Sequence, residues 1–333
     1  MSGPLDRRSV LGMVAGAALL PGCASPRRAP RPAAGLRPPD RELMVPVEGG
    51  RVYLRVNGDL AGPRPPILFV HGGPGSGHSN YLPALALADT RAVILYDQLD
   101  AGRSDAPGDP RHWRVARFVD EIDHIRRALA LERLHVHGGS WGGTIALEYA
   151  ARRPAGLAST ILQSPLISTR RWLADAAILR RSLPPEVQAT LDRCERPAPP
   201  PEPVCAAATE EFNRRFLMRE PRPPAIAAYR AALPIPFNSR IYEAMWGKTE
   251  FVSTGTLKDY DGEPLLARLD GRRTLFMTGE HDEARPATVA AFARRVPGAE
   301  FVVIAGAGHA IAIDRPRLFL AVLDRWLKRH DGP

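Results

Sequence analysis

A serine flanked by glycines, in the run HGGSWGG at residues 137–143, is the strongest candidate for chemistry in this chain. A serine hydroxyl is a poor nucleophile near neutral pH, so it needs a base within hydrogen-bonding reach and an acid that orients the base. The pattern G-x-S-x-G places such a serine on a sharp turn between a strand and a helix. Residues 134–137 predict the strand and residues 143–152 the helix, so we predict that Ser140 is a nucleophile.

The base is expected near the end of the chain. His309 follows the apolar run FVVI and a glycine-rich turn, whereas His281 is a loop residue and His330 lies in the charged tail. Asp282 follows the preceding apolar run, in TLFMTGEHD. The order Ser140, Asp282, His309 is that of an α/β-hydrolase, so these three residues are the predicted catalytic group.

An acyl-transfer site also needs two hydrogen-bond donors for the negative charge that develops on the carbonyl oxygen. One donor is expected to be the amide of Trp141, directly after the predicted nucleophile. The other is expected from the loop HGGPG at residues 71–75. Pro74 has no N–H, so Gly73 is the predicted second donor of this oxyanion hole.

The elements that must position these residues follow an α/β pattern. Apolar runs predict strands at residues 67–70, 92–96, 134–137, 159–162, 274–278 and 301–304, and helical periodicity separates them. Between residues 166 and 255 the strand signal disappears, and helical segments separated by prolines replace it. We therefore predict an α/β-hydrolase fold with a mostly parallel central sheet, helices on both faces and an inserted helical cap. The predicted parts are an export signal and tether (1–40), the first part of the core (41–165), the cap (166–255) and the second part of the core (256–333).

Composition excludes some function classes. The chain has 333 residues and a net charge of +9, of which the six arginines and two aspartates of residues 1–40 contribute +4. The other arginines are scattered, so we predict no nucleic-acid partner. His135 and His137 share one face of a predicted strand without a third ligand, which favours packing over a metal site. No metal and no cofactor are expected, and the sequence leaves the oligomeric state open.

The first forty residues have the features of an export signal. Arg7 and Arg8 precede an apolar run at residues 10–20 that is too short to span a bilayer, and together they resemble a twin-arginine export signal. The run Leu-Pro-Gly-Cys that ends at Cys23 resembles a lipoprotein cleavage box. We predict an exported, periplasmic or extracytoplasmic protein, attached to the membrane through a lipidated Cys23. The alternative is an N-terminus that merely contains two arginines.

Two further cysteines remain in the chain. Cys194 and Cys205 lie on either side of a proline-rich segment in the predicted cap. An exported protein meets oxidising conditions, so we predict a disulfide between them. The alternative is a pair of free thiols.

Three motifs carry a family resemblance. HGGPG at 71–75, DQLDAGRSD at 97–105 and GGSWGG at 138–143 together resemble the proline iminopeptidases. In the cap, EFNRRFLMR and TEFVSTGTLKDYD resemble the tricorn-interacting aminopeptidase branch, and the likeness covers most of residues 41–330. It implies that Glu250 and Glu283 bind the free amine of the substrate, since charge-assisted hydrogen bonds suit an ammonium group. The alternative is that both are ordinary surface glutamates.

The resemblance implies a serine aminopeptidase that acts through an acyl-enzyme. Its expected substrate is a short peptide or an amino-acid amide with an N-terminal proline or a small apolar residue. Two departures, Asp100 where relatives often carry glycine and Gly143 where many carry serine, leave the substrate open. Related amino-acid amidases keep the same catalytic group. The alternatives are a carboxylesterase or lipase with that catalytic group and an inactive, lipid-tethered binding protein.

Overall fold

The computed structural model describes residues 35–332, and these contain one eight-stranded sheet. The strand order is β1-β2-β4-β3-β5-β6-β7-β8, and every pairing from β4 to β8 is parallel. The strands are β1 (Arg41–Val47), β2 (Gly50–Asn57), β3 (Ile67–Val70), β4 (Val93–Asp97), β5 (Leu134–Gly139), β6 (Leu157–Gln163), β7 (Thr274–Gly279) and β8 (Glu300–Ile304). The predicted mostly parallel sheet is therefore confirmed.

The first two strands were not predicted as strands. β1 and β2 form an antiparallel hairpin, and β2 pairs antiparallel with β4 at the edge of the sheet. Six of the seven β1 residues stay partly or fully exposed, so its sequence lacks the continuous apolar run of the central strands. An edge strand of this kind gives a weak signal because only one side of it is covered.

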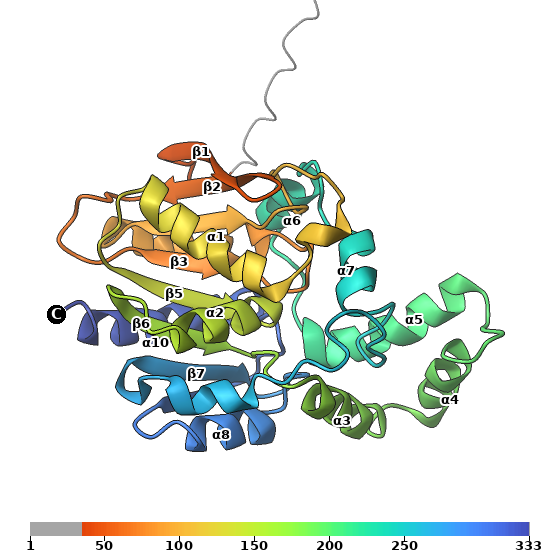
Figure 1. The fold of residues 1–333 in the computed structure, drawn as a ribbon. Coiled ribbons are helices and arrows are strands. Elements are labelled where there is room, and N and C mark those ends of the chain that lie inside the picture. The colour runs from red at the N-terminus through yellow and green to blue at the C-terminus, as the bar shows by residue number, and fades with distance from the viewer. Residues whose placement is uncertain (1–34, 333) are drawn as a thin grey trace, which may run out of the picture. The chain divides into compact units, whose positions relative to one another are not determined.

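Helices cover both faces of the sheet, as predicted (Figure 1). On one face lie α1 (Val115–Ala128), α2 (Trp141–Ala151) and α8 (Pro286–Arg294), and on the other lie the 3₁₀ segment η1 (His78–Asp89), α9 (Ile311–Asp314) and α10 (Pro316–Arg329). Successive strand residues point to opposite faces. In β3, Leu68 and Val70 accordingly join the core under α1, whereas Ile67 and Phe69 join the core under α10.

Helix α1 is shorter than the periodicity predicts. Apolar residues at helical spacing over residues 115–131 predict a helix of that length, but the helix ends at Ala128. Ala130 takes a left-handed conformation with φ 53°, and the amide of Leu131 donates to the carbonyl of Arg126. This is the bonding of a Schellman cap, in which a glycine normally occupies the left-handed position. Because alanine stands there in place of glycine, the sequence does not indicate where the helix ends.

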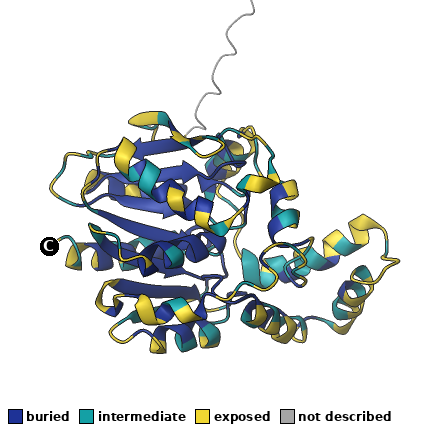
Figure 2. Ribbon diagram, in the orientation of Figure 1, coloured by how far each residue is buried: buried dark blue, intermediate teal, exposed yellow. Residues whose placement is uncertain are grey.

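The segment between β6 and β7 is helical and carries its own small core. Its helices are α3 (Thr169–Arg180), α4 (Pro185–Cys194), α5 (Glu202–Phe212), α6 (Pro224–Ala231) and α7 (Ser239–Met245), followed by a long loop. Prolines begin α4 and α6, where the missing N–H is not needed. Phe212 and Leu191 belong to a separate hydrophobic cluster in this segment. Much of α4 and α5 is exposed (Figure 2).

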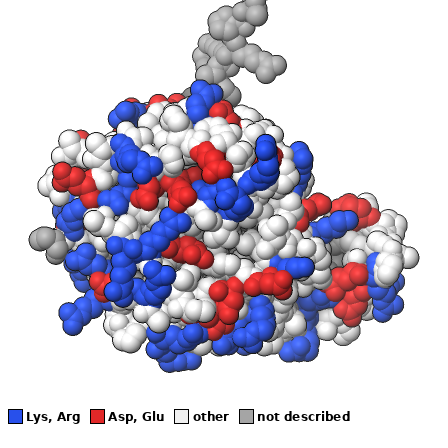
Figure 3. Space-filling model, viewed as in Figure 1, with Lys and Arg blue, Asp and Glu red and all other residues white. Residues whose placement is uncertain are grey.

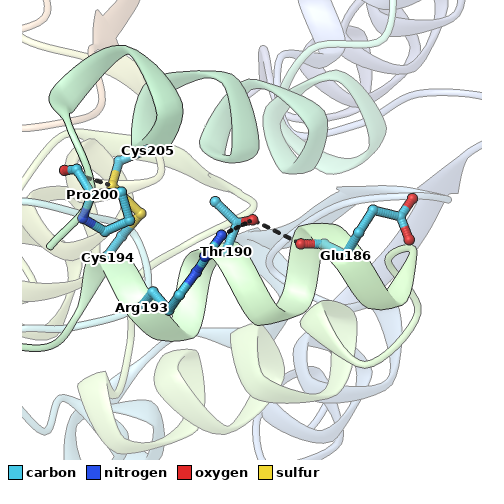
Figure 4. The surroundings of a disulfide bond; sticks show 6 residues. All are labelled: Glu186, Thr190, Arg193, Cys194, Pro200 and Cys205. Atoms are coloured by element: carbon cyan, nitrogen blue, oxygen red, sulfur yellow. Dashed lines mark hydrogen bonds between the residues drawn. A yellow bond between two sulfur atoms is a disulfide. The ribbon is translucent and has the colours of Figure 1, made fainter.

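A disulfide joins α4 to α5 in this cap. The sulfur atoms of Cys194 and Cys205 are bonded, with the two residues eleven positions apart in the sequence. Figure 4 shows the bond at the end of α4, where the chain turns back into α5. It closes the loop that contains the prolines between the two helices.

Charged side chains are spread over the surface. Basic and acidic groups alternate across the face drawn in Figure 3. Within residues 35–332, no helix is both long and apolar enough to cross a membrane. The predicted export signal, including Arg7, Arg8 and Cys23, lies outside the described residues.

Candidate active site

Ser140 lies on the turn between β5 and α2. Its backbone has φ 56° and ψ −121°, a conformation that costs a non-glycine residue free energy and persists only where the surroundings enforce it. The flanking glycines make that turn sterically feasible. A Cβ atom on Gly138 would lie 2.1 Å from the carbonyl oxygen of Gly142, and one on Gly142 would lie 2.1 Å from that of Val70. Helix α2 begins at Trp141, two residues before the predicted start.

Asp282 and His309 meet at the same edge of the sheet, after β7 and β8. His309 Nδ1 donates to Asp282 Oδ1 over 2.8 Å. The carboxylate of Asp282 is buried and also accepts from the hydroxyls of Thr278 and Ser164. Backbone amides of the adjacent residues donate further hydrogen bonds to the same carboxylate. These bonds fix the orientation of Asp282, which in turn fixes the ring of His309.

Ser140 and His309 line one cavity of about 320 Å³. No hydrogen bond joins their side chains in the described chain. His309 Nε2 instead faces Glu283 Oε1 at 3.6 Å. Hydrogen bonds of catalytic groups often tighten only when substrate is bound, so this arrangement is compatible with transfer of a proton from Ser140. Burial opposes protonation of His309, but Asp282 and then Glu283 outweigh it and raise its pKa to about 9.

Both predicted amine-binding glutamates line the same cavity. Tyr242 Oη donates to Glu250, while Glu283 Oε2 is buried without a hydrogen-bond partner in the described residues. Burial raises the pKa of each carboxyl group, and the charge of Glu250 raises that of Glu283 further. A cation bound beside them would offset the cost of burying both negative charges.

The predicted oxyanion donors also lie beside Ser140. Trp141 is the first residue of α2, so its amide has no partner within the helix. Gly73 lines the cavity with Ser140. Gln98 links the two segments, because its Oε1 accepts from Trp141 Nε1 and its Nε2 donates to the carbonyl of His71. The sequence did not single out Gln98, although it lies inside the DQ motif.

A second, smaller cavity of about 30 Å³ opens next to Ser140. Its walls are mostly apolar, and Glu250 contributes the only acidic side chain to the described lining. Its apolar lining includes Leu166, Trp172, Trp246 and Leu257. Trp172 also meets the ring of His309 edge to face, with ring centres 5.7 Å apart. The space suits a small apolar side chain.

The two departures from the family pattern have local structural roles. Asp100 has φ 65°, in the left-handed region that favours glycine. Its carboxylate offsets that cost by accepting from the amide of Gly108 and the indole of Trp113. A Cβ atom on Gly143 would lie 2.7 Å from Pro165 Cβ, so this chain has little room for serine there.

The two histidines of β5 are buried, and each forms a side-chain hydrogen bond. His135 Nδ1 bonds with Ser159 Oγ over 2.8 Å, and His137 Nε2 with Gln163 Oε1 over 3.1 Å. Burial lowers the pKa of His135 to about 4 and that of His137 to about 3. Neutral rings of this kind pack inside the sheet.

Comparison with known proteins agrees with the fold described above. Residues 65–316 match the family described as alpha/beta hydrolase fold. The chain is 37% identical to the proline iminopeptidase of Heyndrickxia coagulans over 291 residues, which cover 86% of this chain and 98% of that protein. A solved proline iminopeptidase from Mycobacterium smegmatis superposes with a TM-score of 0.79 at 35% identity, over 87% of this chain and 99% of that one. The structure of VinJ gives a TM-score of 0.81 at 34% identity, over 88% and 100% of the two chains.

Proposed function

The chain belongs to the proline iminopeptidase family of α/β-hydrolases, and from this we propose that it is a serine aminopeptidase. It removes an N-terminal proline or small apolar residue from short peptides or amino-acid amides. One observation carries the proposal. The cavity that Ser140 and His309 line also holds two glutamates whose burial is best offset by an ammonium group.

The reaction follows from the positions of the side chains. Ser140 Oγ attacks the carbonyl carbon of the N-terminal residue while His309 Nε2 takes the hydroxyl proton. The amides of Gly73 and Trp141 stabilise the oxyanion. As the C–N bond breaks, His309 returns the proton to the leaving nitrogen. Water then attacks the acyl-enzyme by the same route and releases the N-terminal amino acid.

Selectivity for a free N-terminus comes from Glu250 and Glu283. An ammonium group that leaves water needs anionic partners, and these two carboxylates lie beside the reacting serine. Selectivity for a small apolar residue comes from the cavity of about 30 Å³ walled by Trp172 and Trp246. An ester or lipid substrate has no positive charge to offset the two glutamates.

We further propose that the protein is exported and lipid-anchored through Cys23. The twin arginines Arg7 and Arg8 and the cysteine box support this proposal. The disulfide between Cys194 and Cys205 also supports it, because such bonds persist mainly in oxidising compartments.

A panel of chromogenic substrates tests the enzymatic proposal. Prolyl and alanyl arylamides with a free amine should be hydrolysed, and the same compounds with an acetylated amine should be hydrolysed at least about tenfold more slowly, because a hydrogen bond to a charged group contributes about 1.5–3 kcal/mol. Equal turnover of free and acetylated compounds would contradict the aminopeptidase and favour an esterase.

A further inference from the structure

Two arginines of the cap line the same cavity as Ser140. Arg222 lies just before α6, and Arg230 lies within it. Arg222 Nε donates to Asn80 Oδ1 over 3.1 Å. Arg230 Nη1 is buried without a hydrogen-bond partner among the described residues. None of the reaction steps above uses either side chain.

Both arginines are partly buried and carry a positive charge. Burial lowers the pKa of Arg222, and burial together with the charge of Arg222 lowers that of Arg230. No carboxylate of the described chain forms an ion pair with either group. Two partly buried cations that repel each other cost folding free energy, and an anion bound between them would offset that cost.

The cavity therefore contains groups of both signs. Glu283 lies against His309, whereas Arg222 is bonded to Asn80 of η1, and neither arginine forms an ion pair with a glutamate of the described chain. Lys248 also lines the cavity, but its side chain is exposed. A ligand that matches this pattern carries an ammonium group at one end and an anion at the other. Guanidinium groups suit a carboxylate, because the planar N–H donors match its two oxygens.

We propose that Arg222 and Arg230 bind the free C-terminal carboxylate of the substrate, on the leaving-group side of Ser140. This inference rests on the proposed aminopeptidase function and narrows it. With the ammonium bound to the glutamates and the chain end bound to the arginines, the preferred substrates are dipeptides and other short peptides with a free carboxylate. Amino-acid amides and peptides blocked at the C-terminus are the poorer substrates.

The test compares prolylalanine with prolylalanine amide, which differ only at the C-terminus. The readout is the ratio of kcat/KM for the acid to kcat/KM for the amide, which cancels any loss of active enzyme. In the wild type we expect a ratio of at least about ten, because hydrogen bonds between ionised groups are roughly twice as strong as those between neutral groups. Arg222→Gln and Arg230→Gln should each move the ratio toward one, and added salt should lower it in the wild type.

Arg219→Gln is the matched control. It removes the same charge from the same segment, but Arg219 is exposed and does not line the cavity, so the ratio should stay at the wild-type value. If a glutamine variant does not fold, Arg222→Lys or Arg230→Lys takes its place, and the ratio should still fall because a lysine cannot donate in the same two-pronged way.

Two results would overturn the carboxylate site. One is a wild-type ratio near one, and the other is an unchanged ratio in the variants at both arginines. Either result would leave the aminopeptidase intact as long as prolyl arylamide is cleaved. Failure of the wild type to cleave prolyl arylamide would instead overturn the proposed function itself.

Discussion

His309 is the residue whose ionisation the site controls most directly. A histidine acts as a general base only when it is neutral, and Asp282 and Glu283 raise the pKa of this one to about 9 in the unliganded site. Activation of Ser140 should therefore increase with pH up to about pH 9. A substrate ammonium bound to the glutamates would offset their charge and lower the pKa of His309 again. In this account the substrate itself helps to create the base.

The pH dependence of this step can be measured without a titrating substrate. The rate at which a fluorophosphonate inactivates Ser140 should rise with pH, with a midpoint near 9. Glu283→Gln removes an anion that favours the protonated ring, so the midpoint should move to lower pH. Glu280→Gln removes an exposed acid from the same loop and should leave it in place. A midpoint that does not move in Glu283→Gln would contradict the coupling.

The sequence pattern indicated candidate residues for the site but not the side chains that hold them in place. Ser140, Asp282 and His309 each follow a strand, so strand order alone brings them to one edge of the sheet. Ser164 and Tyr242 bond Asp282 and Glu250 through tertiary packing, and neither stands out by type or spacing. The charges of Arg222 and Arg230 become informative only once the structure shows that no carboxylate of the described chain forms an ion pair with them.

Among the elements, the cap is tied directly to the loop that carries His309. The amide of His309 donates to the carbonyl of Phe216 over 2.9 Å, and Phe216 belongs to the π-helical turn η3 (Asn213–Leu217) that follows α5. Asp314 of α9 accepts from the amides of both Arg219 and Gly308. We therefore expect the rigidity of the cap to affect catalysis as well as access to the cavity.

Removal of the disulfide offers a way to change the rigidity of the cap. A cross-link between residues eleven positions apart is worth about 3 kcal/mol through the entropy of the unfolded loop. Cys194→Ser with Cys205→Ser should loosen α4 and α5, which faster amide hydrogen exchange in those helices would report. Reductant should have the same effect on the wild type and none on the double variant. Unchanged exchange in α4 and α5 would show that packing alone orders the cap.

Sequence periodicity predicted most central strands and long helices but missed the elements whose sequence signal is weak. The β1–β2 hairpin covers an edge and has a mixed pattern of exposure. Helix α7 has only seven residues, too few for a period to be visible. Both elements depend on contacts with the rest of the fold, which a local pattern does not record.

For the whole molecule, the central proposal is an exported enzyme that trims short peptides. Replacement of both Arg7 and Arg8 by lysine should retain the protein in the cytoplasm, because twin-arginine export depends on that pair. Cell fractionation measures the change. Cys23→Ser should leave export in place and release the protein from the membrane fraction. Normal export of the double lysine variant would contradict the predicted signal.

The role of the acidic pair in binding the substrate amine is tested by the effect of Glu250→Gln on free and acetylated prolyl arylamides. We expect kcat/KM for the free amine to fall about 10- to 100-fold, the loss expected for a hydrogen bond to a charged group. We also expect that the low rate on the acetylated compound hardly changes, because that compound has no ammonium group to bind. An equal loss on both compounds, or no loss on either, would contradict the account.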